Sequence, residues 1–274
     1  MAVKMIVSDL DGTLLNKHDQ ISDITRKAID DALTAGIHFV VATGRAIGTL
    51  PQQIREIEGI EYAITSNGAV TTKLKTSEIV STAYIDEAAT YELEKYIFEL
   101  DTMVEIFVNG KAYIEKRIYD DIYNQGLSDR GIRYVLKTRT PQPDLREVFR
   151  KYRSQIENIN ICFKDQEMKQ RIWAKFSKFQ DITVTSSMKH NIELIGKNTD
   201  KSTAIEKLMK LHEVTRDELM AFGDNHNDVG MIRLAKIGVA MGNAENALKK
   251  EADYITGTNI DDGVAEAIYK FAGI

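Results

Sequence analysis

Short apolar runs alternate with stretches of helical spacing along the first 70 residues. Residues 4–9 form a run rich in β-branched residues, which is typical of a parallel strand buried on both faces. Ser22 begins a predicted helix, and Gly36 stands where a helix C-terminal cap belongs. Two further apolar runs lie at 38–43 and 62–67, with a short helical stretch between them. This order of elements predicts a parallel sheet covered by helices.

The same pattern returns after residue 190. Helical spacing predicts helices at 201–212, 227–235, 244–251 and 262–272. Apolar runs predict strands at 190–195, 219–222, 237–241 and 253–256. Both ends of the chain therefore belong to one α/β domain with a Rossmann-like parallel sheet, which we place at 1–83 and 190–274.

The middle of the chain has a different pattern, and it predicts an inserted α+β cap domain at 84–189. Runs at 103–108 and 111–115 flank Asn109-Gly110, the strongest short-range signal for a tight hairpin. Further strands are predicted at 134–136, 159–163 and 182–185, with helices at about 86–100, 144–153 and 165–178.

Composition and charge narrow the function classes. The formal net charge is −5 and the sequence pI is about 5.7, and no basic stripe of the kind that clamps nucleic acid is present. The first twelve residues resemble neither a signal peptide nor a membrane span. The single cysteine, Cys162, lies in an apolar run and excludes a disulfide within the chain. We expect a cytoplasmic protein with no nucleic-acid or membrane partner.

Polar clusters follow four of the predicted parallel strands. They are Asp9, Asp11, Gly12 and Thr13; Thr43, Gly44 and Arg45; Asn67 and Gly68; and Gly223, Asp224, Asn227 and Asp228. A single cluster of this kind is readily explained by helix capping. Four clusters at the carboxyl ends of strands in one open α/β sheet instead indicate a ligand site at that edge.

Carboxylates dominate this predicted edge, and crowded carboxylates repel one another unless a cation is present. Oxygen ligands favour Mg²⁺ or Ca²⁺ over zinc, and sparse carboxylates with room for water and phosphate favour Mg²⁺. A carboxylate beside a divalent ion can attack phosphorus. Thr43, Gly44, Asn227 and a lysine such as Lys201 could then hold the phosphoryl oxygens.

These residues resemble the motifs of the haloacid dehalogenase superfamily of phosphotransferases. In order, the matching segments are Asp9-Leu10-Asp11-Gly12-Thr13-Leu14-Leu15, Thr43-Gly44-Arg45, Lys201 and Gly223-Asp224-Asn225-His226-Asn227-Asp228. The position of the insertion resembles the type II, subclass B cap of the Cof-like sugar-phosphate phosphatases. So do Ser66-Asn67-Gly68-Ala69, Gly238-Val239-Ala240-Met241-Gly242-Asn243 and Asp261-Asp262-Gly263-Val264.

The resemblance implies a role for each matching residue. Asp9 would form an aspartyl-phosphate, and Asp11 would protonate the leaving oxygen and later activate water. Mg²⁺ would be held by Asp9, Asp11 through its backbone carbonyl, and Asp224, with Asp228 in support. Phosphate oxygens would be held by Leu10, Thr43, Gly44, Lys201 and Asn227.

One departure leaves an alternative open: Ser202 stands where the family usually has glycine after the motif lysine, so Lys197 could take the role of Lys201.

The expected function is Mg²⁺-dependent hydrolysis of small phosphorylated metabolites, in particular sugar phosphates. A phosphomutase or phosphotransferase acting on sugar phosphates, and a non-catalytic phosphosugar-binding protein, are the alternatives. The substrate would be selected by the insertion and by the loops that face it. Polar candidates there are Tyr113, Arg117, Tyr123, Arg133 and His190, although each is more readily explained as surface or fold support. The sequence leaves the oligomeric state open.

Overall fold

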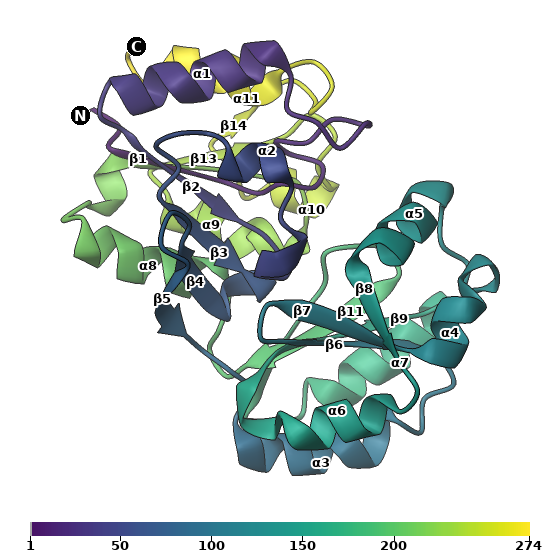
Figure 1. Ribbon diagram of the computed structural model, residues 1–274. Helices are drawn as coiled ribbons and strands as arrows, with labels where there is room; N and C mark the ends of the chain where they lie inside the picture. Colours follow the sequence, from purple (N-terminus) through teal and green to yellow (C-terminus); the bar gives the residue numbers. More distant parts are fainter. Residues whose placement is uncertain (1) are drawn as a thin grey trace. The chain divides into compact units, whose positions relative to one another are not determined.

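The structure is a computed structural model that describes residues 2–274 in two compact units. The first unit contains the described residues up to Gly44, Leu50–Thr82 and Asp200–Ile274. The second unit contains Arg45–Thr49 and Ala83–Thr199. Each unit has its own sheet and its own covering helices (Figure 1).

The first unit is built on an eight-stranded sheet with the strand order β14-β13-β12-β1-β2-β3-β4-β5. The strands are β1 (Met5–Ser8), β2 (His38–Ala42), β3 (Tyr62–Thr65), β4 (Val70–Lys73), β5 (Glu78–Thr82), β12 (Leu219–Gly223), β13 (Ile237–Ala240) and β14 (Tyr254–Ile255). Neighbours from β14 to β3 pair in parallel, whereas β4 and β5 form an antiparallel extension. The sequence did not predict this extension.

Helices cover both faces of this sheet, so its central strands are buried on both sides. The helices are α1 (Asp23–Thr34), α2 (Gln52–Arg55), α8 (Lys201–Leu211), α9 (Val229–Leu234), α10 (Asn246–Lys249) and α11 (Gly263–Phe271). In Figure 1, α1 and α11 lie side by side on one face, and α8 and α9 lie on the other. Every residue of β1, β3 and β12 is buried, which explains why the sequence shows continuous apolar runs there.

The second unit has a six-stranded sheet with the order β10-β11-β9-β6-β7-β8. Its strands are β6 (Met103–Val108), β7 (Lys111–Glu115), β8 (Arg139–Gln142), β9 (Ile156–Cys162), β10 (Ile182–Thr185) and β11 (Asn191–Gly196). Its helices are α3 (Glu87–Ile97), α4 (Lys116–Asp120), α5 (Asp129–Thr138), α6 (Leu145–Lys151) and α7 (Gln166–Phe176). The predicted hairpin joins β6 to β7, with Asn109 and Gly110 both at positive φ.

Two sequence predictions in this region are wrong. Residues 134–136 lie in α5, where Ser128 caps the helix by accepting from the amide of Gly131, and where Ile132 and Val135 share a buried face. Strand β11, which we assigned to the α/β domain, pairs with β9 and β10 and therefore belongs to the second unit.

The predicted fold class is confirmed, since a parallel α/β sheet carries a second, α+β unit between β5 and α8. Across residues 2–274, no helix combines the length and apolar character needed to cross a membrane.

Candidate active site

Acidic residues from two neighbouring strands meet at the carboxyl edge of the first unit's sheet. Asp9 follows β1, and Asp224 and Asp228 follow β12, which pairs in parallel with β1. Ligand oxygens of the three carboxylates lie within 4.8 Å of one another. The parallel register therefore brings together side chains that are more than 200 residues apart in the chain.

Lys201 is a completely buried cation in the middle of this group. Its Nζ donates to Asp9 Oδ1 at 2.5 Å and to Asp228 Oδ1 at 2.6 Å. The other oxygen of Asp228 accepts from the backbone amides of Asp224 and Asn225, at 2.9 and 3.1 Å. Asp228 thus links the lysine to the loop that carries Asp224.

The beginning of α8 fixes the position of Lys201. Asp200 caps the helix by accepting from the amide of Thr203 at 2.8 Å, and Ser202 donates to Asp200 at 2.7 Å. Gly68 has a φ of +100°, and a Cβ there would lie 2.1 Å from the carbonyl oxygen of Asp200. Only glycine permits this approach, which places the first turn of α8 against the loop after β3.

Burial and charge shift the ionisation of these groups strongly. Burial raises the pKa of Asp9 to about 7, with Lys201 opposing this effect and Asp228 adding to it. Burial and then Asp9 and Asp228 raise the pKa of Asp224 to about 9. Burial would lower the pKa of Lys201, but Asp228 and Asp9 outweigh it and raise that pKa. The single ammonium group of Lys201 therefore does not balance the negative charge that Asp9, Asp224 and Asp228 would carry if all three were ionised.

The donor set fits a small, hard divalent cation. Asp9, Asp224 and Asp228 offer only oxygen, a ligand set that suits Mg²⁺ better than zinc. Gly12 leaves room for this arrangement, because a Cβ at that position would lie 2.3 Å from Oδ2 of Asp224. Thr13 donates to the other oxygen of Asp224 at 3.4 Å. The hydrogen bond from Thr13 joins the Asp224 carboxylate to the loop that contains Asp9 and Asp11.

Neutral polar groups surround the acids on the side of β2 and β3. Thr43 follows β2, and its amide donates to the carbonyl of Ile64 at 2.9 Å. Asn227 donates to Asn67 Oδ1 at 2.9 Å, and the backbone of Gly44 approaches the same Asn67 amide. Asn67 has a φ of +56°, and this left-handed conformation turns the chain sharply after β3. Such groups can donate to phosphate oxygens.

All of the predicted site residues lie in the first unit, and the structure brings the charged ones together. Asp11 lies in the loop after β1, and its charge contributes to the raised pKa of Asp9. Leu10 lies between Asp9 and Asp11 and is fully buried. Lys201 contacts Asp9, whereas the alternative, Lys197, is exposed and pairs with Asp181 at 3.2 Å. Ser202 is accommodated in the first turn of α8.

Comparison with known proteins agrees with this geometry. A sequence model of the family described as haloacid dehalogenase-like hydrolase matches residues 6–268. The chain belongs to this family.

The most informative relatives are phosphatases from the same family. The Bacillus subtilis 5-amino-6-(5-phospho-D-ribitylamino)uracil phosphatase YcsE is 30% identical, over 97% of this chain and 94% of its own. A haloacid dehalogenase-like hydrolase structure from B. subtilis is 29% identical with a TM-score of 0.86, over 97% and 99% of the two chains. The subclass IIB sugar phosphatase BT4131 shares the fold, at 22% identity and a TM-score of 0.82, over 99% and 100%. The predicted family and the predicted enzyme class, a phosphoric monoester hydrolase, are confirmed.

The sheet of the second unit carries a polar network that was not predicted from the sequence. Side chains alternate along β6, β9 and β11, so that Val104, Ile106, Ile159, Ile161, Ile192 and Leu194 form an apolar core on one face. The opposite face carries Glu105, Asn158, Asn160, Asn191 and Glu193, all buried. This period-two alternation of polar residues within apolar strands was the available signal.

Hydrogen bonds join the members of this network. Arg139 forms a two-pronged ion pair with Glu105, at 2.6 and 2.9 Å, and Asn160 donates to the same carboxylate at 2.8 Å. Asn158 and Asn191 donate to Glu193 at 2.7 and 2.9 Å. The side-chain oxygen of Asn158 is buried without a hydrogen-bond partner. A buried acceptor of this kind is unusual and needs an explanation, such as an ordered water or an ion that donates to or binds it, or a strained side chain.

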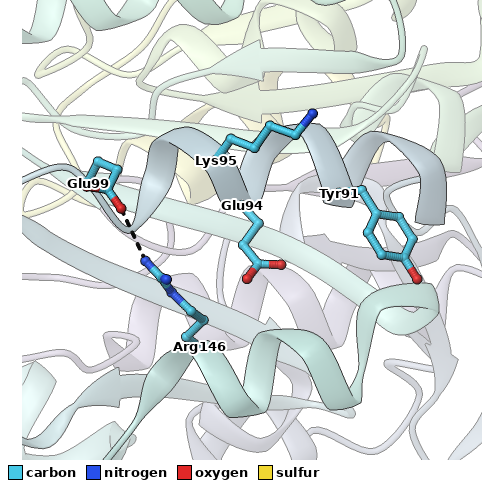
Figure 2. Close-up of a pocket in the computed structure, with 5 residues that line it drawn as sticks. All are labelled: Tyr91, Glu94, Lys95, Glu99 and Arg146. Carbon is cyan, nitrogen blue, oxygen red and sulfur yellow. Dashed lines mark hydrogen bonds and ion pairs between the residues drawn. The ribbon is translucent and has the colours of Figure 1, made fainter.

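Two of the polar residues that the sequence suggested for substrate selection, Tyr113 and Tyr123, lie outside this network. Tyr113 packs against the apolar core of the second unit, and Tyr123 is 73% exposed. Figure 2 shows a hollow on the same unit lined by Tyr91, Glu94, Lys95, Glu99 and Arg146. Arg146 pairs with Glu99 at 3.4 Å there, and no predicted site residue lines the hollow.

Proposed function

We propose that the protein is a Mg²⁺-dependent phosphatase of small phosphorylated metabolites, acting through an aspartyl-phosphate on Asp9. The observation that carries this proposal is the buried Asp9–Lys201–Asp228 arrangement, with Asp224 within metal-sharing distance. Magnesium at this place would be held by Asp9, the backbone carbonyl of Asp11, and Asp224, with Asp228 in support. The ion would neutralise charge as a carboxylate approaches a phosphate.

Each residue of the site has its own role in the proposed reaction. An oxygen of Asp9 attacks phosphorus, and the bond between phosphorus and the substrate oxygen breaks. Asp11 gives its proton to that leaving oxygen. Asp11, now ionised, takes a proton from a water molecule that attacks the aspartyl-phosphate, which releases phosphate and restores Asp9. Lys201 and Asn227 stabilise the phosphoryl oxygens during both steps, together with the backbone of Leu10 and Gly44 and with Thr43.

The second unit is proposed to select the substrate. A relative that is named for a phosphoribityl substrate supports a substrate with a polyol or sugar portion. The amide and carboxylate groups of Asn158, Asn160 and Glu193 have the chemistry that recognises hydroxyl groups. Sugar phosphates and sugar-alcohol phosphates are therefore the proposed substrate class.

A phosphate-release screen of purified protein against phosphorylated metabolites tests the function. We expect release of phosphate to need Mg²⁺, to stop with excess chelator and to return when Mg²⁺ is restored. Asp9→Asn should abolish both turnover and labelling of the protein by phosphate, because an amide is a poor nucleophile of nearly the same shape. Full phosphate release by a folded Asp9→Asn protein would exclude the assignment. Product analysis in the presence of a second sugar separates hydrolysis from phosphoryl transfer.

A further inference from the structure

A second group of potential ligands lies in the first unit, at the edge of the sheet opposite the acids. His38 is the first residue of β2, Glu61 directly precedes β3, and His212 caps the carboxyl end of α8. Because β2 and β3 run parallel, their first residues share one edge of the sheet. Helix α8 begins at Lys201 in the acid site and, at 1.5 Å per residue, is about 16 Å long. The two groups are therefore separate.

The three side chains are close enough to share one ion. One ligand atom from each of His38, Glu61 and His212 can be chosen so that all lie within 4.8 Å of one another. The two imidazole rings have centroids 4.2 Å apart at 48°, and Tyr62 packs edge-on against His212 at 5.3 Å. Ligand atoms around tetrahedral zinc lie about 3.4 Å apart. Side-chain rotations that shorten these separations by at most about 1.4 Å would complete the geometry. All three side chains are only partly buried.

An independent observation points to a ligand at this place. The Nε2 atom of His212 is buried and has no hydrogen-bond partner. A buried polar atom without a partner costs about 1–3 kcal/mol and needs an explanation.

The neighbours of Glu61 orient its carboxylate. Lys73 on β4 pairs with Glu61 Oε1 at 2.9 Å. Tyr62 forms a further side-chain hydrogen bond with Glu61. Because a carboxylate has two oxygens, Lys73 can hold one while the other coordinates an ion. Outer hydrogen bonds of this kind commonly fix metal ligands.

We propose that His38, Glu61 and His212 form a zinc-binding site distinct from the Mg²⁺ site. Two imidazoles and one carboxylate suit zinc and are poor ligands for Mg²⁺, which prefers oxygen. Bound zinc ties the amino ends of β2 and β3 to the carboxyl end of α8. The inference does not depend on the proposed function, since it uses none of the acid-site residues.

The test measures zinc binding by the full-length protein after removal of any affinity tag and dialysis against chelator. We expect one zinc per chain, a visible spectrum on cobalt substitution that shows nitrogen ligation, and a rise in Tm. At zinc about 100-fold above its Kd, that rise should be roughly 5–10 °C. His212→Gln and His38→Gln, each shown to be folded by circular dichroism, should lose the cobalt spectrum and the rise in Tm.

Two control variants separate this site from others. His18→Gln changes an exposed histidine outside the group and should bind zinc as the unaltered protein does. Asp224→Asn weakens the acid site and should also leave zinc binding unchanged. Retention of the zinc-induced rise in Tm by both folded variants, His38→Gln and His212→Gln, would overturn the proposal. Loss of zinc binding in Asp224→Asn would equally overturn it, because zinc would then occupy the acid site.

Discussion

Replacing Gly12 by alanine should impair the acid site far more than it impairs the fold. Gly12 has a φ of +81°, and an added Cβ would lie 2.3 Å from Oδ2 of Asp224. Gly36 offers a matched control, because its φ is +82° and a Cβ there would meet nothing within 4 Å. Both alanine variants incur the same backbone strain, about 1–2 kcal/mol. Only Gly12→Ala also displaces a carboxylate.

The size of that displacement sets the expected loss of activity. Relief of the contact requires the carboxylate of Asp224 to move by more than about 1 Å, and a misplacement of about 1 Å in a reacting site costs about 10²-fold in rate. We expect kcat/KM of Gly12→Ala to fall by about 10²-fold. The Mg²⁺ concentration for half-maximal activity should rise by about 10- to 100-fold, as expected when metal ligands are disturbed.

The assay compares the two variants under identical conditions. Phosphate release is measured across a Mg²⁺ titration, and stability is measured by urea unfolding. Both variants should lose similar free energy of unfolding, while Gly36→Ala keeps the activity and Mg²⁺ dependence of the unaltered protein. Equal kcat/KM values and equal Mg²⁺ requirements for the two variants would refute the reasoning, since the contact with Asp224 would then have no consequence.

Three further predictions concern the charge balance, the proton donor and substrate selection. Lys201→Met should lower the free energy of unfolding without Mg²⁺ by about 3–5 kcal/mol, because it leaves buried carboxylates without their cation. Lys197→Met should change it by less than about 0.5 kcal/mol, since Lys197 is exposed, and equal losses in urea unfolding would contradict the assignment. Asp11→Asn should slow the transfer of phosphate from sugar phosphates to Asp9 by about 10²–10⁴-fold, and should slow it less for aryl phosphates, whose leaving group needs no proton; equal slowing of this first step for both, in single-turnover measurements, would exclude Asp11 as the acid. Glu193→Gln should change the order of kcat/KM values among sugar phosphates in a substrate panel without changing aryl phosphate hydrolysis. An unchanged order would show that the polar network does not select the substrate.

The parallel sheet was predictable because each strand carries its own local signal. Strands that are buried on both faces appear in the sequence as continuous apolar runs. Because the strands are parallel, the polar residues that follow them lie at one edge of the sheet. Residues 134–136 were mistaken for a strand because three apolar or aromatic residues fit a strand and a helix equally well. The cap formed by Ser128 and the burial of Ile132 and Val135 on one face stabilise the helix.

Features that depend on long-range register could not be predicted. Lys197 and Lys201 are four residues apart, and only the helix start at Lys201 distinguishes them structurally. The polar network of the second unit requires knowledge of which strands pair. The group of His38, Glu61 and His212 is assembled from segments up to 174 residues apart, and nothing in the sequence near any one of them indicates the others.

The pairing of β1 with β12 has a consequence for the order of events during synthesis. The register joins Met5 to Leu219, so the first strand leaves the ribosome long before its partner exists. At about 5–20 residues per second, the delay is roughly 10–40 s. Residues 83–199 form an almost continuous unit that can fold during that interval. During that interval the apolar β1 has no β12 to pair with, and an unpaired apolar strand favours aggregation of the nascent chain.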